Sequence, residues 1–197
     1  MVSQSRSQGT PRSGHHLDED ARFQKVAHAA VRVLRQVINM LLAKHKRVHV
    51  LMAEGNHDDD PSLWLRVMFG AFYEKDPRVT VDVSPLPYYI YEHGSCLIAF
   101  HHGHLKKKAG LPLLIAAQFP EVWGRTKYRV VHVGHMHHMD VKDADGIRVH
   151  QHGTLAARDA YAARGGWISP RYAEAITYHK SRGYYGSVVT TPEDIVE

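Results

Sequence analysis

The sequence predicts an α/β protein, a mixed β-sandwich flanked by helices. Short apolar runs with β-type alternation recur along the chain, and segments with helical spacing lie between them. The 197 residues, 44% of them hydrophobic, are enough to bury a core, and this length favours one domain over two. Because hairpins are mixed with helices, we expect a sandwich rather than a parallel doubly wound sheet.

The first elements are read from polar composition and from apolar spacing. Residues 1–16 lack a hydrophobic period and are predicted to form a flexible polar arm, which leaves 17–197 as a single domain. Three-and-four spacing predicts a helix over 18–45, and alternation over 47–53 predicts a short strand. Pro61 suits the first turn of a second helix, whose periodic apolar residues are Leu63, Trp64, Val67, Met68 and Phe72.

The remaining elements alternate between strands and helices. A helix is expected over 111–122, interrupted by Pro112 and Pro120. Asp145-Gly146 is a turn signal between two of the expected strands, and His93-Gly94-Ser95 is another. A candidate helix covers 156–164. Strands are predicted over 79–83, 88–92, 96–100, 128–133, 139–141, 147–152 and 184–190.

The composition of the chain bears on its partners, its cellular compartment and its association with membranes. The net charge of +5 favours anionic partners such as nucleotides or nucleic acid, although a solvated basic surface explains it equally well. Cys96 is the only cysteine, so an internal disulfide is excluded and a reducing cytoplasm is the expected compartment. We find no apolar run near the roughly 18 residues that a spanning helix needs, and therefore expect no membrane association.

Three histidine-bearing motifs carry the chemistry. Nine of the seventeen histidines lie between His101 and His152, and each motif follows an apolar run, so the motifs are expected at strand ends that form one site. Imidazole nitrogens and an amide oxygen suit manganese, zinc, iron or nickel better than calcium. The motifs are Gly55-Asn56-His57-Asp58, His101-His102-Gly103-His104 and Gly134-His135-Met136-His137-His138.

The spacing within the third motif leaves two arrangements open. His135 and His137 would point to one face if the preceding strand extends through them. After Gly134, a loop in which each histidine faces a different metal is equally compatible with the sequence. His101 and His138 are expected to be neighbours of the ligands, and His150 and His152 to line a strand face.

In this order, the motifs resemble those of the calcineurin-like metallophosphoesterase family of the phage and bacterial type, over about residues 47–155. The resemblance implies helix, sheet, sheet and helix layers around two metal ions. It implies that Asn56, His102 and His135 bind one metal and that His137 binds the other. His57 would then be the catalytic histidine.

Further roles follow from the same resemblance. Asp58 would orient the catalytic histidine, and His104 would touch the substrate or lie behind the ligands. Lys106 follows at a position where a cation draws phosphate inward. The implied reaction is hydrolysis of a phosphate monoester or diester by a hydroxide that two metals activate, and nucleotides or nucleic acid are among the candidate substrates.

The family pattern also begins with an Asp-x-His and a Gly-Asp, and neither occurs in these 197 residues. We therefore expect a chain that starts downstream of the missing segment, as a truncated gene product, a split-gene product or a fragment. Two dications about 3.5–4 Å apart repel strongly without a bridging carboxylate. The chain alone is thus predicted to hold at most one metal well at this site and to turn over weakly or not at all.

Two consequences concern partners and the alternative function. Loss of two strands would leave an open sheet edge, so we expect self-association or a partner chain that supplies the missing aspartates. The alternative to a hydrolase is a catalytically inactive remnant that keeps a metal-binding or nucleic-acid-binding role.

Overall fold

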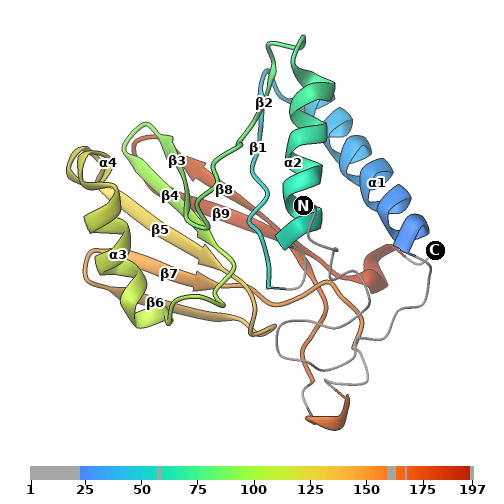
Figure 1. Cartoon of the computed structure of the whole chain (residues 1–197). Helices are drawn as coiled ribbons and strands as arrows, with labels where there is room; N and C mark the ends of the chain where they lie inside the picture. The colour runs from blue at the N-terminus through green and yellow to red at the C-terminus, as the bar shows by residue number, and fades with distance from the viewer. Residues whose placement is uncertain (1–22, 57–58, 159–162, 167, 196–197) are drawn as a thin grey trace, which may run out of the picture. The chain divides into compact units, whose positions relative to one another are not determined.

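The computed structural model describes residues 23–56, 59–158, 163–166 and 168–195 (Figure 1). The chain divides into two compact units. The first unit runs to Pro85 and the second begins at Leu86. The predicted arm over 1–16 lies outside the described residues, and the single domain over 17–197 stays a prediction.

The first unit contains two helices and a small parallel sheet. Its strands pair in register, Val48 with Val79 and Val50 with Val81. Ile38, Phe69 and the two strands form its core. The elements in chain order are α1 (Phe23–Lys44), β1 (Val48–Val50), α2 (Asp59–Tyr73) and β2 (Val79–Val81).

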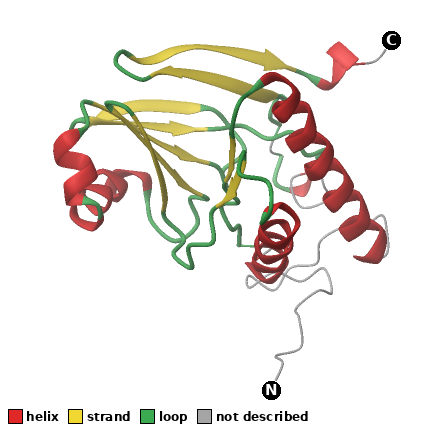
Figure 2. Cartoon of the chain, turned by 90° about the horizontal axis from the view of Figure 1, so that it is seen from above, coloured by secondary structure: helices red, strands yellow, loops and turns green. Residues whose placement is uncertain are grey.

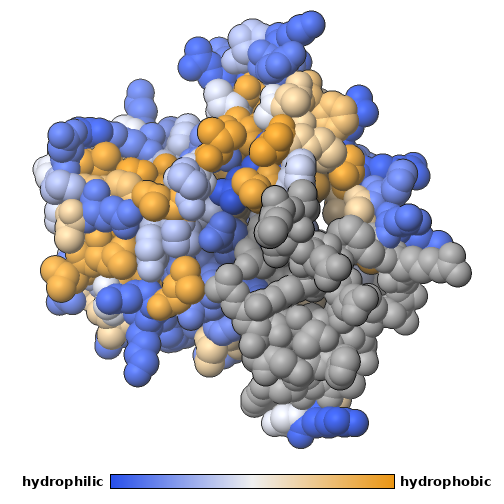
Figure 3. Space-filling view, viewed as in Figure 1, coloured by the Kyte–Doolittle hydropathy of each residue, from blue (hydrophilic) through white to orange (hydrophobic). Residues whose placement is uncertain are grey.

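Helix α2 is where the sequence predicts it, but its most apolar face points outward. Ser62, Arg66 and Phe69 are buried at helical spacing. Arg66 tolerates burial because it donates to the Glu54 carboxylate at 3.2 Å and to the Ser84 carbonyl at 2.6 Å. Most of the residues that predicted the helix are exposed: Leu63, Trp64, Val67 and Phe72. Figure 3 shows apolar surface in the region of α2.

Helix α1 corrects one statement from the sequence. Its segment Gln24–Lys44 is long and apolar enough, by length and composition only, to cross a membrane. Arg32 and Arg35 break the run of apolar letters, which hides this property on reading. One such helix does not place a chain in a membrane, so the expectation of no membrane association stays a prediction.

The second unit is built on a five-stranded mixed sheet in the order β3-β4-β5-β7-β6. The three central strands are parallel, and the two edge strands pair with them antiparallel. A separate antiparallel hairpin follows near the C-terminus. The strands are β3 (Tyr89–His93), β4 (Cys96–His101), β5 (Tyr128–Val133), β6 (Asp140–Ala144), β7 (Ile147–Gln151), β8 (Ala173–His179) and β9 (Gly183–Thr190).

The two faces of this sheet have different neighbours (Figure 2). Helices α3 (Leu111–Gln118) and α4 (Pro120–Arg125) supply Leu111, Ile115 and flanking apolar residues to the core on one face. On the other face, Tyr178 of β8 packs against Cys96, Ile98 and Val130. The chain is therefore a mixed α/β protein with a mixed sheet between helices and a β-hairpin, as the sequence predicts.

Local turn chemistry explains most of the boundaries. Asp145 and Gly146 have φ of 51° and 81°, which makes the β6–β7 connection the tight hairpin that the sequence predicts. Pro112 lies in the first turn of α3, and Pro120 starts α4, so the two prolines divide the expected helix into two. Strand β8 has no counterpart among the predicted elements, and the candidate helix over 156–164 lies partly outside the described residues.

Two phenylalanines of α2 give a matched test of the first unit's core. Phe69 is 0% exposed and Phe72 is 55% exposed. Phe69→Ala should lower the free energy of unfolding by about 3–5 kcal/mol, because it leaves a cavity. Phe72→Ala should cost less than about 1 kcal/mol. Denaturant unfolding of both variants checks this, and equal losses would contradict the packing.

Candidate metal centre at the ends of strands β4 and β5

Strands β4 and β5 bring two of the histidine motifs to the same edge of the sheet. They pair in parallel, with His101 opposite Val133 at their carboxyl ends. The loops that follow start with His102 and Gly134, and the amide of Gly134 donates to the carbonyl of His102 at 2.9 Å. The sequence separates the two motifs by about thirty positions, but parallel pairing places them side by side.

Three imidazole rings converge there. The ring centres of His102 and His135 are 5.2 Å apart, and those of His102 and His104 are 5.3 Å apart. His104 and His135 are separated by 6.3 Å. Two imidazoles that share a tetrahedral ion at about 2.1 Å have ring centres roughly 5 Å apart. The donors are of the kind that binds a divalent transition metal. The ligand nitrogens of these three histidines do not all lie within 4.8 Å of one another, so the loops must close further before all three rings share an ion.

Gly103 allows this approach of the two loops. Its φ is 107°, a conformation that L side chains rarely adopt. An added Cβ would lie 3.2 Å from the Gly134 carbonyl oxygen and 3.4 Å from the Cβ of His135. Any larger residue would strain the backbone and push the third motif away from the second.

The third motif is a loop and not an extension of the strand. Strand β5 ends at Val133, and His135 and His137 both have left-handed backbones, with φ of 70° and 55°. Such conformations cost energy in residues other than glycine and cluster at functional sites. His137 is exposed, and no ring contact joins it to the three converging imidazoles within the described part of the chain.

Neighbouring groups hold these loops in place. The buried side-chain amide of Gln151 donates to the His138 carbonyl at 2.8 Å, which ties the third motif to the end of β7. The ring of His138 donates from Nδ1 to the Met136 carbonyl at 2.9 Å. His101 is buried, and its Nδ1 bonds to the Pro87 carbonyl at 3.0 Å while its ring packs against Tyr88.

Four other residues were predicted for the site, namely Asn56, His57, Asp58 and Lys106. His57 and Asp58 lie outside the described residues. Asn56 belongs to the first unit, where it is partly buried beside the buried Gly55. Lys106 is exposed, and the end of its side chain lies against Gly110. Their catalytic, metal-binding and substrate-binding roles stay predictions.

Sequence reasoning missed a second group of histidines. His150 and His152 were expected to line a strand face, and His132 was not singled out, yet one ring nitrogen from each of the three lies within 4.8 Å of the others. The signal in the sequence was weak. His150 and His152 are two residues apart at the end of a strand, so their side chains are expected on the same face of the sheet. His132 lies opposite His150 in the neighbouring strand.

Comparisons with known proteins add little to this geometry. No protein-family model matches the chain, and no curated protein matches it. Among solved structures, the chain is similar to a conserved uncharacterized protein of Streptococcus pneumoniae TIGR4, called a predicted phosphoesterase. The two are 14% identical over 82% of this chain and 90% of that chain, with a TM-score of 0.35. A similarity at this level carries no argument about function.

Gly103 provides a test of how the loops are positioned. Gly103→Ala should lower the free energy of unfolding by about 1–3 kcal/mol, because alanine is strained at this φ and contacts Gly134. It should also weaken metal binding by His102 and His135. Differential scanning calorimetry and equilibrium dialysis with Mn²⁺ measure the two effects.

Gly124→Ala is the matched control. Gly124 lies in α4, and an added Cβ there meets nothing within 4 Å. Alanine has the higher helix propensity, so this variant should be up to about 1 kcal/mol more stable than the wild type. The loop argument fails if both variants change stability in the same direction.

Proposed function

We propose that this chain is a metal-dependent phosphoester hydrolase domain that supplies the neutral, histidine-rich half of a two-metal site. The convergence of His102, His104 and His135 from two separate motifs carries the proposal. Imidazoles gathered at a sheet edge are the donor type that first-row transition metals accept, and closure of the two loops would bring these rings onto one ion. The order of the three sequence motifs, which resembles that of metallophosphoesterases, supports phosphoester hydrolysis as the reaction.

The residues of this chain have distinct tasks in the proposed reaction. Asn56, His102 and His135 hold one ion, and His137 holds the other. Divalent metals at such a site supply Lewis acidity and a nucleophile that is available at neutral pH. His57 gives a proton to the leaving oxygen, a task suited to a group that titrates near neutrality, and Asp58 fixes its tautomer.

The lack of charge on the proposed ligands limits the activity of the chain by itself. Its proposed ligands are an amide and imidazoles, all neutral, while the reaction brings together two dications and an anionic phosphate. The described carboxylate of Asp140 is already paired with Lys108. Full activity therefore requires aspartates from outside these residues, through self-association or a partner chain. Without them, the favoured alternative is an inactive remnant that binds one metal.

The substrate class and setting complete the proposal. Manganese, zinc, iron and nickel are the candidate ions, since each accepts imidazole ligands. His104, the outer of the converging rings in the second motif, and the exposed Lys106, two residues further on, offer hydrogen-bond donors to a phosphate monoester or diester. The net charge of +5 favours a nucleotide or nucleic acid in the cytoplasm.

Hydrolysis of bis(p-nitrophenyl) phosphate with added Mn²⁺ tests the activity. Weak turnover is expected for the chain alone, and His102→Gln or His135→Gln should reduce it by about tenfold or more, as loss of a metal partner does. His28→Gln is the control, because His28 is exposed on α1. The same rate in the wild type and in both site variants would exclude the proposed site.

The alternative functions give different readouts. Mn²⁺ binding that depends on His102 and His135, without turnover, identifies the inactive metal-binding remnant. Binding to DNA that falls steeply with salt and needs no metal identifies a nucleic-acid-binding role.

A further inference from the structure

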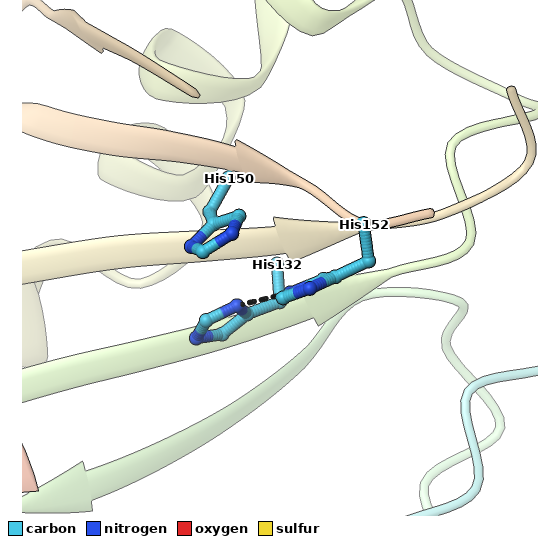
Figure 4. A group of neighbouring side chains, drawn as sticks. All are labelled: His132, His150 and His152. Atoms are coloured by element: carbon cyan, nitrogen blue, oxygen red, sulfur yellow. Dashed lines mark hydrogen bonds between the residues drawn. The ribbon is translucent and has the colours of Figure 1, made fainter. Parts of the chain in front are cut away.

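A second group of metal-binding side chains lies inside the second unit. His132 projects from β5 and His150 from β7, at positions paired in register, and His152 follows the end of β7 (Figure 4). One ligand nitrogen from each lies within 4.8 Å of the others. His132 and His150 are 8% and 6% exposed and His152 is partly buried, so most of the group is shielded from solvent.

A hydrogen-bonded chain runs through this group. The Tyr178 hydroxyl lies 2.9 Å from Nε2 of His132, and Nδ1 of His132 lies 2.8 Å from Nε2 of His152. Nδ1 of His152 is 3.4 Å from the carboxylate of Glu174. With the phenol donating to Nε2 of His132, and Nδ1 of His132 donating to Nε2 of His152, both rings are neutral, and the proton on Nδ1 of His152 lies on the side of Glu174 without forming a hydrogen bond.

Burial keeps the three rings neutral. It lowers the pKa of His132 to about 3, helped by the neighbouring His152 and His150. Burial also lowers the pKa of His150 and of His152, although the charge of Glu174 opposes the change. A neutral imidazole has a lone pair to give to a metal, so these rings do not need to lose a proton to the solvent first.

Two buried polar atoms beside the rings lack a hydrogen bond. Among the described residues, Nε2 of His150 and Oε2 of Glu174 have no hydrogen-bond partner, and they are 3.7 Å apart. The side chain of Glu174 is 10% exposed. Buried polar groups without partners are uncommon in proteins and call for an explanation such as an ion.

We propose that His132, His150 and His152 form a second metal site, for zinc or a neighbouring first-row ion, with Glu174 as the balancing charge. Tyr178 and Glu174 each engage one nitrogen of a ring, which leaves Nδ1 of His132 and Nε2 of His152 facing each other. Groups of this kind orient metal-binding histidines in proteins. The ion replaces the proton between these two nitrogens, and His132 carries its proton on Nε2 instead, toward Tyr178.

Small movements complete the site. Two nitrogens that share a tetrahedral ion are roughly 3.3 Å apart, so the 2.8 Å pair must open slightly. The ring of His150 is stacked on His152, with centres 4.2 Å apart and planes at 20°. It must turn to direct a nitrogen into the gap. Both changes need side-chain rotation only.

The position of the site indicates a structural role. Its ligands come from β5 and the end of β7, and its orienting groups come from β8, so an ion there ties the hairpin to the five-stranded sheet. An ion that binds only the folded state raises the free energy of unfolding, and the increase grows with the logarithm of the ratio of the free ion concentration to the dissociation constant. This inference does not rest on the proposed function.

Cobalt titration of the full chain tests it, in a His102→Gln, His135→Gln background that removes the other cluster. Visible absorption and equilibrium dialysis report Co²⁺ binding, and we expect about one ion per chain and a higher Tm. His152→Gln should weaken binding by at least about tenfold. Zn²⁺ should displace Co²⁺.

Tyr178→Phe is the second variant, because it removes only the hydroxyl that orients His132 and leaves the ring in the core. It should weaken Co²⁺ binding by about tenfold and keep the far-ultraviolet circular dichroism of the parent. His28→Gln is the control and should leave binding unchanged. The proposal is overturned if the double-variant background binds no Co²⁺, or if it binds Co²⁺ with an affinity that neither His152→Gln nor Tyr178→Phe changes.

Discussion

Parallel pairing of the three central strands of the second unit is the constraint on which both histidine clusters depend. Parallel neighbouring strands end at the same edge of the sheet, so the loops after β4 and β5 lie side by side there. Gly103, which has no side chain, lets the two loops approach each other closely. The same pairing puts His132 and His150 side by side on one face. A shift of register by one residue would turn both to the other face and separate them from His152.

The elements were predictable where local chemistry determines them. Proline positions, the Asp145-Gly146 turn and strict alternation predicted the helices and most strands. Tertiary effects decided the rest. Arg66 is buried in α2 because Glu54 and the Ser84 carbonyl satisfy it, and no helical period reveals such partners. In strand β8 the small residues Ala173, Ala175 and Thr177 alternate with Glu174, Ile176 and Tyr178, which leaves only two large apolar side chains as a strand signal.

The two histidine clusters differ in how far a sequence could predict them. His102, His104 and His135 follow apolar strands within recognisable motifs, and their convergence requires only that the strands be parallel neighbours. The buried cluster is harder to predict from the sequence, because it also depends on which face of the sheet β8 covers. Two residues of that strand, Glu174 and Tyr178, contact the histidines. A histidine inside a strand, read alone, says nothing about the partner across the sheet.

The two clusters differ in how well their electrostatic surroundings stabilise a bound ion. At the loop cluster the predicted ligands are neutral and solvent is near, so a second dication there has no anion to offset repulsion. The buried cluster includes its own carboxylate, Glu174, and is less accessible to solvent, which strengthens the attraction between the ion and the carboxylate. The cost of removing a dication from water is offset only where enough ligands surround it. In this chain taken alone, a tightly held metal is therefore better accommodated by the buried histidines than by the motif that suggests catalysis, and metal content alone does not indicate a working active site.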